Sequence, residues 1–573
     1  MDASIPAKQL RWLYIFIAGA AVVNFSGLFV TIVGPDGALY ATIAKTMVIH
    51  HNYTDLIVNG TDWLDKPHFP FWVAALSFKL FGFTTWAYKL PGILFLLMGA
   101  VYTYYFAKSM YNKQIALWSV LILLTAEHIL LSNYDVRAEP YLTGLIIASV
   151  YHFYKANLRN SFWHLLAGSV FAACAIMTKG MFALIPIGGA MVGQFIITKQ
   201  WKQLFNLRWL IAAVLILIFI IPELYCLYRQ FDMHPEKVVF GGKGVSGIRF
   251  FFWDSQFGRF FNTGPIKGSG DPFFFVHTTL WAFLPWSLLL FAAIFLFIKK
   301  GVKNVQQHEW YCICGALLTF LVFSASKFQL PHYMNIVFPF FAIITAQLLY
   351  NIKQPKGIKA VRITQIVVIV AMLVVAGAIQ YFYYPAISWV LVVVLCLLYV
   401  LMVFLPYGIG DSVIQKAIFC TVLTSFIVNL YLNLAFYPSL VKYQSGSEAA
   451  MWIDKNNPHN YPVVQCENDA WPMEFYLNTP LGTIDEDTVK TPPKNTYLLY
   501  TTSDMVNRLS ARGWQLQKVC DLKRYSITRL KPAFLNKKTR SKQLTAMQIV
   551  LVNPPMGANF NFVIDKTAIP RKK

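Results

Sequence analysis

The chain has 573 residues, of which 57% are hydrophobic and only 13% are charged, whereas soluble domains contain about 25% charged residues. Together with many long apolar runs, this composition predicts a polytopic α-helical membrane protein and excludes an ordinary soluble one. The net charge of +23 does not indicate nucleic acid as a partner, because the basic residues collect in short loops beside the apolar runs. We expect these residues to set the membrane topology and to contact lipid head groups.

Apolar runs predict about 13 transmembrane helices within residues 1–440. A helix that crosses a membrane needs about 20 apolar residues, or about 17 at the short end. Candidate runs lie at 11–33, 88–107, 114–133, 138–155, 163–178, 181–197, 209–229, 275–298, 309–325, 333–350, 363–381, 386–405 and 415–437. Only Thr178-Lys179-Gly180 divides the fifth run from the sixth.

Basic residues in alternate loops predict the orientation of these helices. The loops on the side of the N-terminus carry Lys8, Arg11, Lys108, Lys113, Lys155, Arg159, Lys199, Lys202, Arg208, Lys299, Lys300, Lys303, Lys353, Lys356, Lys359, Arg362 and Lys416. Short cytoplasmic loops are enriched in Lys and Arg, so we expect the N-terminus to be cytoplasmic. The long loops 34–87 and 230–274 would then lie outside the cytoplasm. The C-terminal segment would lie outside too, because the number of predicted spans is odd.

Residues 441–573 are more polar and predict a small α/β domain outside the cytoplasm. Helix-like segments at Ser447–Asp454 and Asp504–Arg512 alternate with strand-like runs at Tyr461–Cys466, Thr496–Thr501, Arg524–Leu530 and Gln548–Val552. We find no glycine-rich phosphate loop in this region and expect no nucleotide site. Cys466 and Cys520 are its two cysteines, and a disulfide between them is one of two open interpretations.

Polar and ionisable residues gather at the outer ends of the predicted helices. Asp36 follows the first apolar run after Gly34-Pro35, in a turn that would hold its carboxylate at the membrane boundary. Other outer segments carry Asp65 and Lys66; Asp135, Arg137 and Glu139; Lys179; Asp254 and Arg259; and Lys327, Gln329, His332 and Tyr333. Ionisable groups in such positions are costly and tend to be functional. Interfacial ion pairs, or lysines extended to lipid head groups, are the structural alternative.

This set of side chains suits transfer of a sugar from a lipid phosphate. A carboxylate such as Asp36 can act as general base on an acceptor hydroxyl, and several Lys and Arg side chains can bind a phosphate. Apolar helices around them suit a lipid tail. No cofactor is required by this chemistry, and no His, Asp or Glu spacing predicts a metal, although Asp36 and Glu139 could hold a divalent ion if the fold joined them.

Several motifs resemble those of bacterial aminoarabinose transferases and protein O-mannosyltransferases, which share the GT-C membrane fold. They are Asp36-Gly37-Ala38-Leu39-Tyr40-Ala41, Trp63-Leu64-Asp65-Lys66-Pro67, Asp135-Val136-Arg137-Ala138-Glu139-Pro140, Thr178-Lys179-Gly180, Leu284-Pro285-Trp286-Ser287, and FSASKFQLPHY at 323–333. Their order along residues 1–350 is more specific than any single motif. The chain departs from the family pattern at Gly37, Leu39, Asp65, His68 and Gln329.

The resemblance implies an inverting glycosyltransferase, a hexosyl- or pentosyltransferase, at the outer face of a bacterial inner membrane. It implies a polyprenyl-phosphate sugar donor and a lipid A, protein or glycan acceptor, with the C-terminal domain in the periplasm. Together, the motifs and the outer residues give candidate catalytic residues Asp36, Asp65 and Glu139. Candidate substrate-binding residues are Tyr40, Trp63, Lys66, His68, Asp135, Arg137, Lys179, Arg259, Lys327, Gln329, His332 and Tyr333. The alternatives are a transporter or flippase for a lipid-linked sugar, and a non-catalytic envelope assembly protein.

Overall fold

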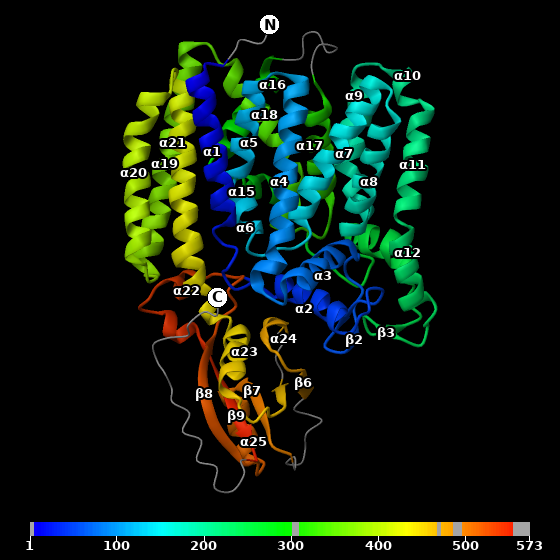
Figure 1. The fold of residues 1–573 in the computed structure, drawn as a ribbon, viewed down its shortest axis with the longest axis vertical. Helices are drawn as coiled ribbons and strands as arrows, with labels where there is room; N and C mark the ends of the chain where they lie inside the picture. The colour runs from blue at the N-terminus through cyan, green and yellow to red at the C-terminus, as the bar shows by residue number, and fades with distance from the viewer. Residues whose placement is uncertain (1–4, 301–308, 467–470, 485–494, 554–573) are drawn as a thin grey trace.

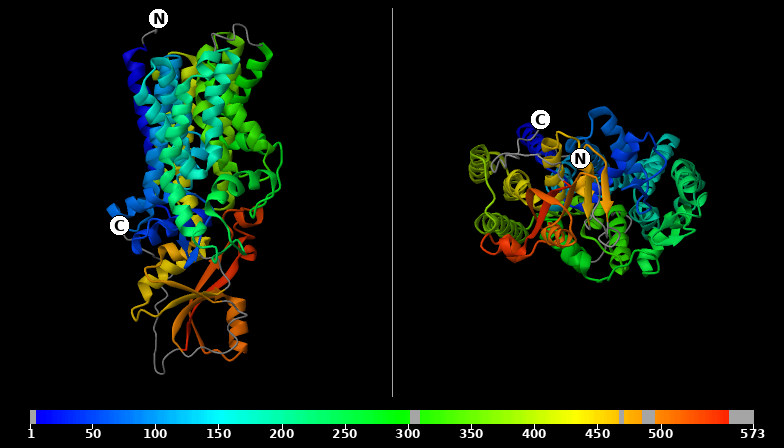
Figure 2. Two further views of the ribbon diagram at one scale, coloured as in Figure 1. Left: turned by 90° about the vertical axis from the view of Figure 1, so that its right-hand side faces the viewer. Right: turned by 90° about the horizontal axis from the view of Figure 1, so that it is seen from below.

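The computed structural model describes residues 5–300, 309–466, 471–484 and 495–553. Long helices pack side by side in a bundle, and a sheet-containing C-terminal domain extends from one end of it (Figures 1 and 2). We call that end the domain end. The first helix, α1 (Ala7–Phe25), begins at the opposite end of the bundle (Figure 1).

Each of the 13 predicted runs contains between one and three consecutive helical segments. After α1, the helices of the bundle are α4 (Thr85–Met110), α5 (Lys113–Leu124), α6 (Glu127–Ser132), α7 (Glu139–Arg159), α8 (Phe162–Lys179), η1 (Met181–Ala183), α9 (Leu184–Ile197), α10 (Trp201–Leu204), α11 (Leu207–Phe219), α12 (Ile221–Leu227), α15 (Phe274–Ala282), α16 (Ser287–Lys300), α17 (Tyr311–Ala325), η5 (Pro331–Val337), α18 (Phe338–Asn351), α19 (Pro355–Phe382), α20 (Trp389–Ile409), α21 (Val413–Tyr431) and η6 (Leu432–Phe436).

Seven helical segments of the described residues are long and apolar enough to cross a membrane, and five further apolar helices are shorter. Several runs are interrupted, so one predicted span corresponds to two helices. The run 275–298 divides into α15 and α16 around Pro285, which cannot donate a backbone hydrogen bond. The chain is a multi-pass membrane protein whose helices are often broken.

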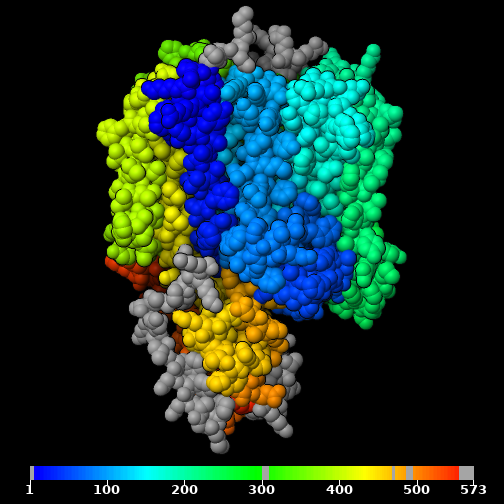
Figure 3. All heavy atoms as spheres, viewed as in Figure 1, coloured from blue at the N-terminus to red at the C-terminus, as the bar shows by residue number. Residues whose placement is uncertain are grey.

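Helices at the edge of the bundle expose apolar side chains, as expected for contact with lipid. On α20, the exposed residues include Trp389, Leu397 and Phe404, which are 77%, 57% and 69% exposed. The space-filling view shows α20 and α11 forming opposite flanks of the bundle (Figure 3). These apolar surfaces fit a bilayer and would be unfavourable in water.

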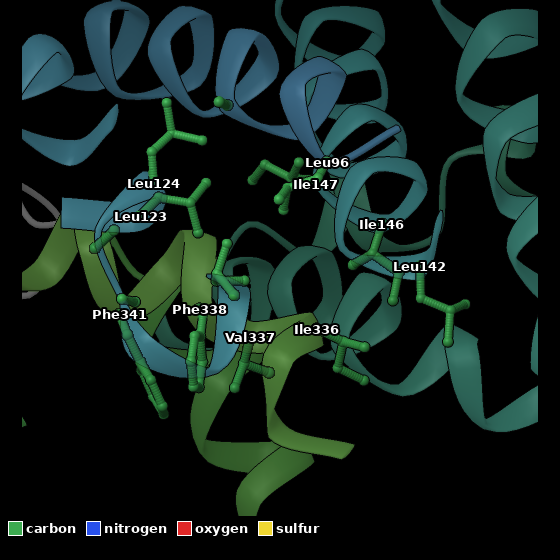
Figure 4. Packing of buried hydrophobic residues seen from close by; sticks show 14 of the residues in the cluster. Leu96, Leu123, Leu124, Leu142, Ile146, Ile147, Ile336, Val337, Phe338 and Phe341 are labelled. Atoms are coloured by element: carbon green, nitrogen blue, oxygen red, sulfur yellow. The ribbon is translucent and has the colours of Figure 1, made fainter. Parts of the chain in front are cut away.

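The interior is built from α4, α5, α7 and α18, whose side chains interdigitate (Figure 4). Leu96, Leu123, Ile147 and Phe338 are all fully buried there. Within a membrane such packing, rather than release of water from apolar surface, holds helices together. Close approach matters most where α4 crosses α7, because a Cβ added at Gly99 would lie 3.0 Å from the Cα of Gly144.

Short elements cover the domain end of the bundle. Helices α2 (Pro35–Ile49) and α3 (Phe69–Phe81) lie between the bundle and the C-terminal domain (Figure 1). The other elements are two antiparallel hairpins, β1 (Ile57–Val58) with β2 (Thr61–Asp62) and β3 (Val238–Val239) with β4 (Gly242–Lys243), and the helical segments η2 (Tyr228–Asp232), α13 (Gly247–Arg249), η3 (Phe250–Gly258) and α14 (Arg259–Phe261).

The C-terminal domain has a five-stranded sheet in the order β6-β5-β7-β9-β8. Strands β6 and β7 run parallel to β5, whereas β9 is antiparallel to both β7 and β8. Its elements are α22 (Tyr437–Leu440), η7 (Val441–Tyr443), α23 (Ser445–Asn456), β5 (Val463–Cys466), α24 (Trp471–Tyr476), β6 (Leu481–Ile484), β7 (Tyr497–Thr502), α25 (Ser503–Ala511), β8 (Leu516–Arg524), α26 (Pro532–Leu535), η8 (Arg540–Gln543) and β9 (Thr545–Val552).

The structure overturns one expected strand of this domain and decides the open question of its two cysteines. The strand expected at Arg524–Leu530 is wrong, because β8 ends at Arg524 and the Tyr525 ring then stacks on Phe534 with centroids 3.7 Å apart. A disulfide between Cys466 and Cys520 is not formed. These residues lie on β5 and β8, with two strands between them, so their separation of about 14 Å exceeds the span of a disulfide.

The close crossing of α4 and α7 gives a test of the packing. A Cβ on Gly144 would overlap the backbone oxygen of Phe95, so Gly144→Ala should destabilise the fold by about 1–3 kcal/mol. Thermal unfolding of the purified protein in detergent measures the effect. Gly377→Ala on α19 is the control, since an added Cβ there meets nothing within 4 Å. Equal melting temperatures for both variants would contradict the packing described.

Candidate active site

A polar cavity of about 300 Å³ lies at the domain end of the bundle. Eleven of the candidate residues from the sequence line it: Asp36, Tyr40, Trp63, Asp65, Lys66, Arg137, Glu139, Lys179, Arg259, His332 and Tyr333. They come from segments separated by up to 297 positions along the chain, from Asp36 to Tyr333 (333 − 36). The fold therefore brings most of the separate motifs to one place.

Asp36 occupies the first turn of α2, where the helix dipole favours a negative charge. Gly34 precedes it with φ +86°, a conformation that glycine adopts without strain, and Pro35 starts the helix. Arg137 Nη1 lies 2.7 Å from Asp36 Oδ2, and the Asp36 side chain remains 41% exposed. The carboxylate is thus oriented by one ion pair but still accessible from the cavity.

Arg137 is shared between two carboxylates. Its Nε and Nη2 donate to Asp135 Oδ2 at 2.8 and 2.6 Å, while Nη1 reaches Asp36. Burial lowers the pKa of Arg137, but Asp135 and Asp36 outweigh this and raise it above its ordinary value. Burial also raises the pKa of Asp135, although Arg137 opposes the effect. Asp135 does not line the cavity, and its part is to hold Arg137 in place for Asp36.

Asp65 joins two cations. Its Oδ2 accepts from Lys66 Nζ at 2.6 Å, and Oδ1 accepts from Arg259 Nη2. Burial would raise the pKa of Asp65, but Lys66 and Arg259 together hold it at about 2. Burial and the neighbouring Arg259 lower the pKa of Lys66 to about 8, although Asp65 opposes them. One carboxylate between two cations leaves net positive charge, which suits a phosphate group.

Lys179 forms a separate ion pair, with Glu139 at the start of α7. Its ammonium lies 3.6 Å from the centroid of the Tyr333 ring, and His332 Nε2 is 3.7 Å from Glu139 Oε1. The Thr178-Lys179-Gly180 motif has a structural reason here, since Gly180 ends α8 with φ +94°. A Cβ on Gly180 would collide with the Gln256 side chain, which donates to the Lys179 carbonyl at 3.2 Å.

Three further candidate residues lie outside the cavity lining. His68 is buried, with its ring nitrogens 3.0 Å from Glu223 Oε1 and from the Thr54 carbonyl, so it fastens the outer loop to α12. Gln329 accepts from the Asp271 backbone and donates to the carbonyls of Phe323 and Ser324, which shapes its own loop. The side chain of Lys327 is exposed. The motifs that contain His68, Gln329 and Lys327 do not predict the direction of these side chains.

A smaller apolar pocket of about 70 Å³ adjoins the polar cavity. Its walls include Leu142, Phe182, Leu227, Phe250 and Phe323. The two spaces share six residues: Asp65, Lys66, Lys179, Arg259, Phe328 and Tyr333. Three cations therefore stand where a polar space meets an apolar one, and such an arrangement suits a group that has both a charged and an apolar part.

The acidic pair considered for a metal is engaged by cations. Asp36 pairs with Arg137, and Glu139 pairs with Lys179. Among the residues that the structure describes, no group of three or more His, Cys, Asp and Glu side chains could hold a metal ion. Three lining residues lie outside the motifs and candidate residues taken from the sequence: Phe240, Ile266 and Trp471. Trp471 belongs to the C-terminal domain, and only a predicted contact between that domain and the bundle could have identified it.

Known proteins resemble the chain in sequence. Residues 65–226 match the family model for dolichyl-phosphate-mannose-protein mannosyltransferases. The undecaprenyl phosphate-alpha-4-amino-4-deoxy-L-arabinose arabinosyl transferase 2 of Proteus mirabilis is 27% identical over 310 residues, 52% of each chain. An uncharacterised protein of Aquifex aeolicus is 26% identical over 348 residues, 59% of this chain and 64% of the relative. The chain thus spans about half to two thirds of the length of these relatives.

Solved structures establish the fold. The crystal structure of ArnT from Cupriavidus metallidurans bound to undecaprenyl phosphate matches 95% of this chain and 98% of its own, with a TM-score of 0.74 and 20% identity. The same protein in the apo state matches over the same shares, with a TM-score of 0.72 and 19% identity. The GT-C membrane fold expected from the motifs is confirmed.

The pKa of Lys66 predicts how anion binding depends on pH. Below about pH 8 the ammonium is charged and attracts a phosphate, whereas above it the neutral amine does not. We expect the affinity for a long-chain alkyl phosphate to fall as pH rises through about 8. Binding measured in detergent between pH 7 and 9.5 tests this, because a phosphate monoester stays dianionic over that range.

Two variants show whether Lys66 is the titrating group. Lys66→Arg keeps its charge throughout this range and should flatten the profile. Lys327→Ala should leave it unchanged, because that exposed side chain lies outside the cavity lining. A profile that still falls near pH 8 in Lys66→Arg would assign the titration to another group.

Proposed function

We propose that this GT-C-fold chain is an inverting glycosyltransferase that moves a sugar from a polyprenyl-phosphate donor to an acceptor hydroxyl. The observation that carries the proposal is the position of Lys66, Arg259 and Lys179 at the junction of the polar cavity and the apolar pocket. A lipid phosphate placed there has its charge among cations, its tail among apolar side chains and its sugar in the cavity that contains Asp36.

The transfer takes place in one displacement. Asp36, oriented by Arg137, accepts the proton of the acceptor hydroxyl as its oxygen attacks the anomeric carbon of the sugar. The bond between that carbon and the phosphate oxygen breaks, and the lipid phosphate leaves with the electron pair. Lys66, Arg259 and Lys179 stabilise its negative charge. Attack opposite to the leaving group inverts the anomeric configuration.

Asp65 and Glu139 act in this proposal as positioning residues. Asp65 holds Lys66 and Arg259, and Glu139 holds Lys179, so each carboxylate fixes cations that would contact the phosphate. Tyr333 places a ring against Lys179 and limits where the ammonium can move. Removing either carboxylate would disorganise the phosphate site without removing the proton acceptor.

The names of the relatives guide the choice of substrates. Several are undecaprenyl phosphate aminoarabinose transferases, so we propose an undecaprenyl phosphate-linked amino pentose as donor and lipid A as the first acceptor to test. A hexose donor, and a protein or another glycan as acceptor, follow from the mannosyltransferase family match. The reaction would then occur at the periplasmic face of the inner membrane, with the N-terminus in the cytoplasm.

A transporter of lipid-linked sugar is the second candidate, and the arrangement of charges favours it less. A transport pathway carries ionisable groups through the depth of the membrane. Here the ion pairs of Asp36, Asp65 and Glu139 all line one cavity at the domain end.

The Asp36→Asn variant tests the proposal. The amide cannot accept the proton, so we expect transfer to fall by about 10²–10⁴-fold while the protein still folds. Mass spectrometry of lipid A and of periplasmic glycoproteins would compare a deletion strain with its wild-type and Asp36→Asn complements. A sugar-sized mass restored by wild type alone would identify the acceptor.

Asp411→Asn is the matched control, because this exposed aspartate precedes α21 and lies outside the cavity lining. It should restore the modification as wild type does. Normal transfer by Asp36→Asn would remove Asp36 from the mechanism. The transporter would be supported instead if the deletion strain kept its glycan pools unchanged but moved the lipid-linked sugar between leaflets less efficiently than wild type.

A further inference from the structure

The polar cavity is completed by the C-terminal domain. Trp471, the first residue of α24, lines the cavity together with Asp36 and Lys66. It does not belong to the lining of the adjoining apolar pocket. Trp471 is half-buried and lines the cavity to which the proposed function assigns the sugar, and not the pocket suited to the lipid tail.

Helix α24 is fastened to α2, the helix that carries Asp36. Lys45 of α2 donates from Nζ to the carbonyls of Glu474, Phe475 and Leu477, at 3.3, 2.9 and 2.7 Å. Glu474 Oε1 also accepts from the backbone N–H of Asn59 at 3.0 Å. The position of Trp471 relative to the catalytic helix is thus fixed by several bonds.

A second set of contacts holds the domain at the residues directly before Asp36. Tyr476 accepts from the Ile32 N–H at 2.9 Å. Gln444 accepts from the Gly34 N–H and donates to the Ile32 carbonyl, both at 2.9 Å. The Phe475 ring stacks on Phe78 of α3, with centroids 5.9 Å apart. These contacts hold the C-terminal domain, and α24 with it, against the residues that surround Asp36.

We propose that Trp471 contacts the sugar ring of the donor and so lets the C-terminal domain take part in substrate selection. The proposal rests on the proposed function. A sugar ring has an apolar face of C–H groups that packs on an aromatic ring, and Trp presents the largest such surface. Trp63 also lines the cavity, but its ring is packed edge-on with Tyr40 and Phe71, at 5.9 and 5.7 Å between centroids.

Binding to two probes separates the sugar contact from the phosphate contact. The full-length protein in detergent would be titrated with undecaprenyl phosphate and with the undecaprenyl phosphate-linked sugar that supports transfer. Trp471→Ala should weaken binding of the sugar-linked donor by about three- to tenfold, the effect of one aromatic contact, and leave undecaprenyl phosphate unchanged. Trp471→Phe should recover part of the loss.

Trp389→Ala is the control, because this Trp is 77% exposed at the start of α20 and lies outside the cavity lining. It should bind both probes as wild type does. Equal weakening of both probes in Trp471→Ala would mean that Trp471 only maintains the shape of the site, and would overturn the proposal. So would unchanged binding of both, or an effect confined to the KM of the acceptor. If wild type transferred no sugar from any polyprenyl-phosphate donor, the proposed function itself would fail.

Discussion

Charge that is buried at one end of an apolar bundle must be paired, and this constraint organises the site. Moving a lone charge out of water costs several kcal/mol, and removing one partner from a buried ion pair typically costs about 3–5 kcal/mol. Here Arg137 forms ion pairs with Asp36 and Asp135. Asp65 pairs with Lys66 and Arg259, and Glu139 pairs with Lys179. The pairs Asp36–Arg137, Asp65–Arg259 and Glu139–Lys179 join different segments, so these charges also fix the geometry of the outer loops.

Most of the candidate site could be predicted because charged residues are conspicuous in an apolar chain. Asp36, Lys66 and Lys179 lie beside long apolar runs, where a charged group is energetically costly and therefore tends to be functional. His68 and Lys327 stand in equally suggestive motifs, yet one is tied to Glu223 and the other is exposed. The direction of a side chain depends on tertiary contacts, and motif position does not carry that information.

The helical fold was predictable from length and hydropathy, but its interruptions were not. Thr125 and Ala126 divide a single apolar run into α5 and α6, where Trp286 donates to the Thr125 hydroxyl and Glu127 donates its N–H to the Leu284 carbonyl. Trp286 and Thr125 are 161 positions apart in sequence, so no local sequence pattern predicts this contact. The same applies to Trp471, whose place in the cavity depends on how a separate domain sits against α2.

The bond between Gly34 and Gln444 joins residues that are 410 positions apart in sequence. During synthesis the first helix and α2 emerge long before the segment that contains Gln444, Trp471 and Tyr476. A chain still being made therefore has its ion-pairing residues in the membrane but lacks the partners that hold Ile32 and Gly34. Assembly of the candidate site is thereby delayed until this segment has been synthesised, and fragments truncated before it would be inserted without the partners of Ile32 and Gly34.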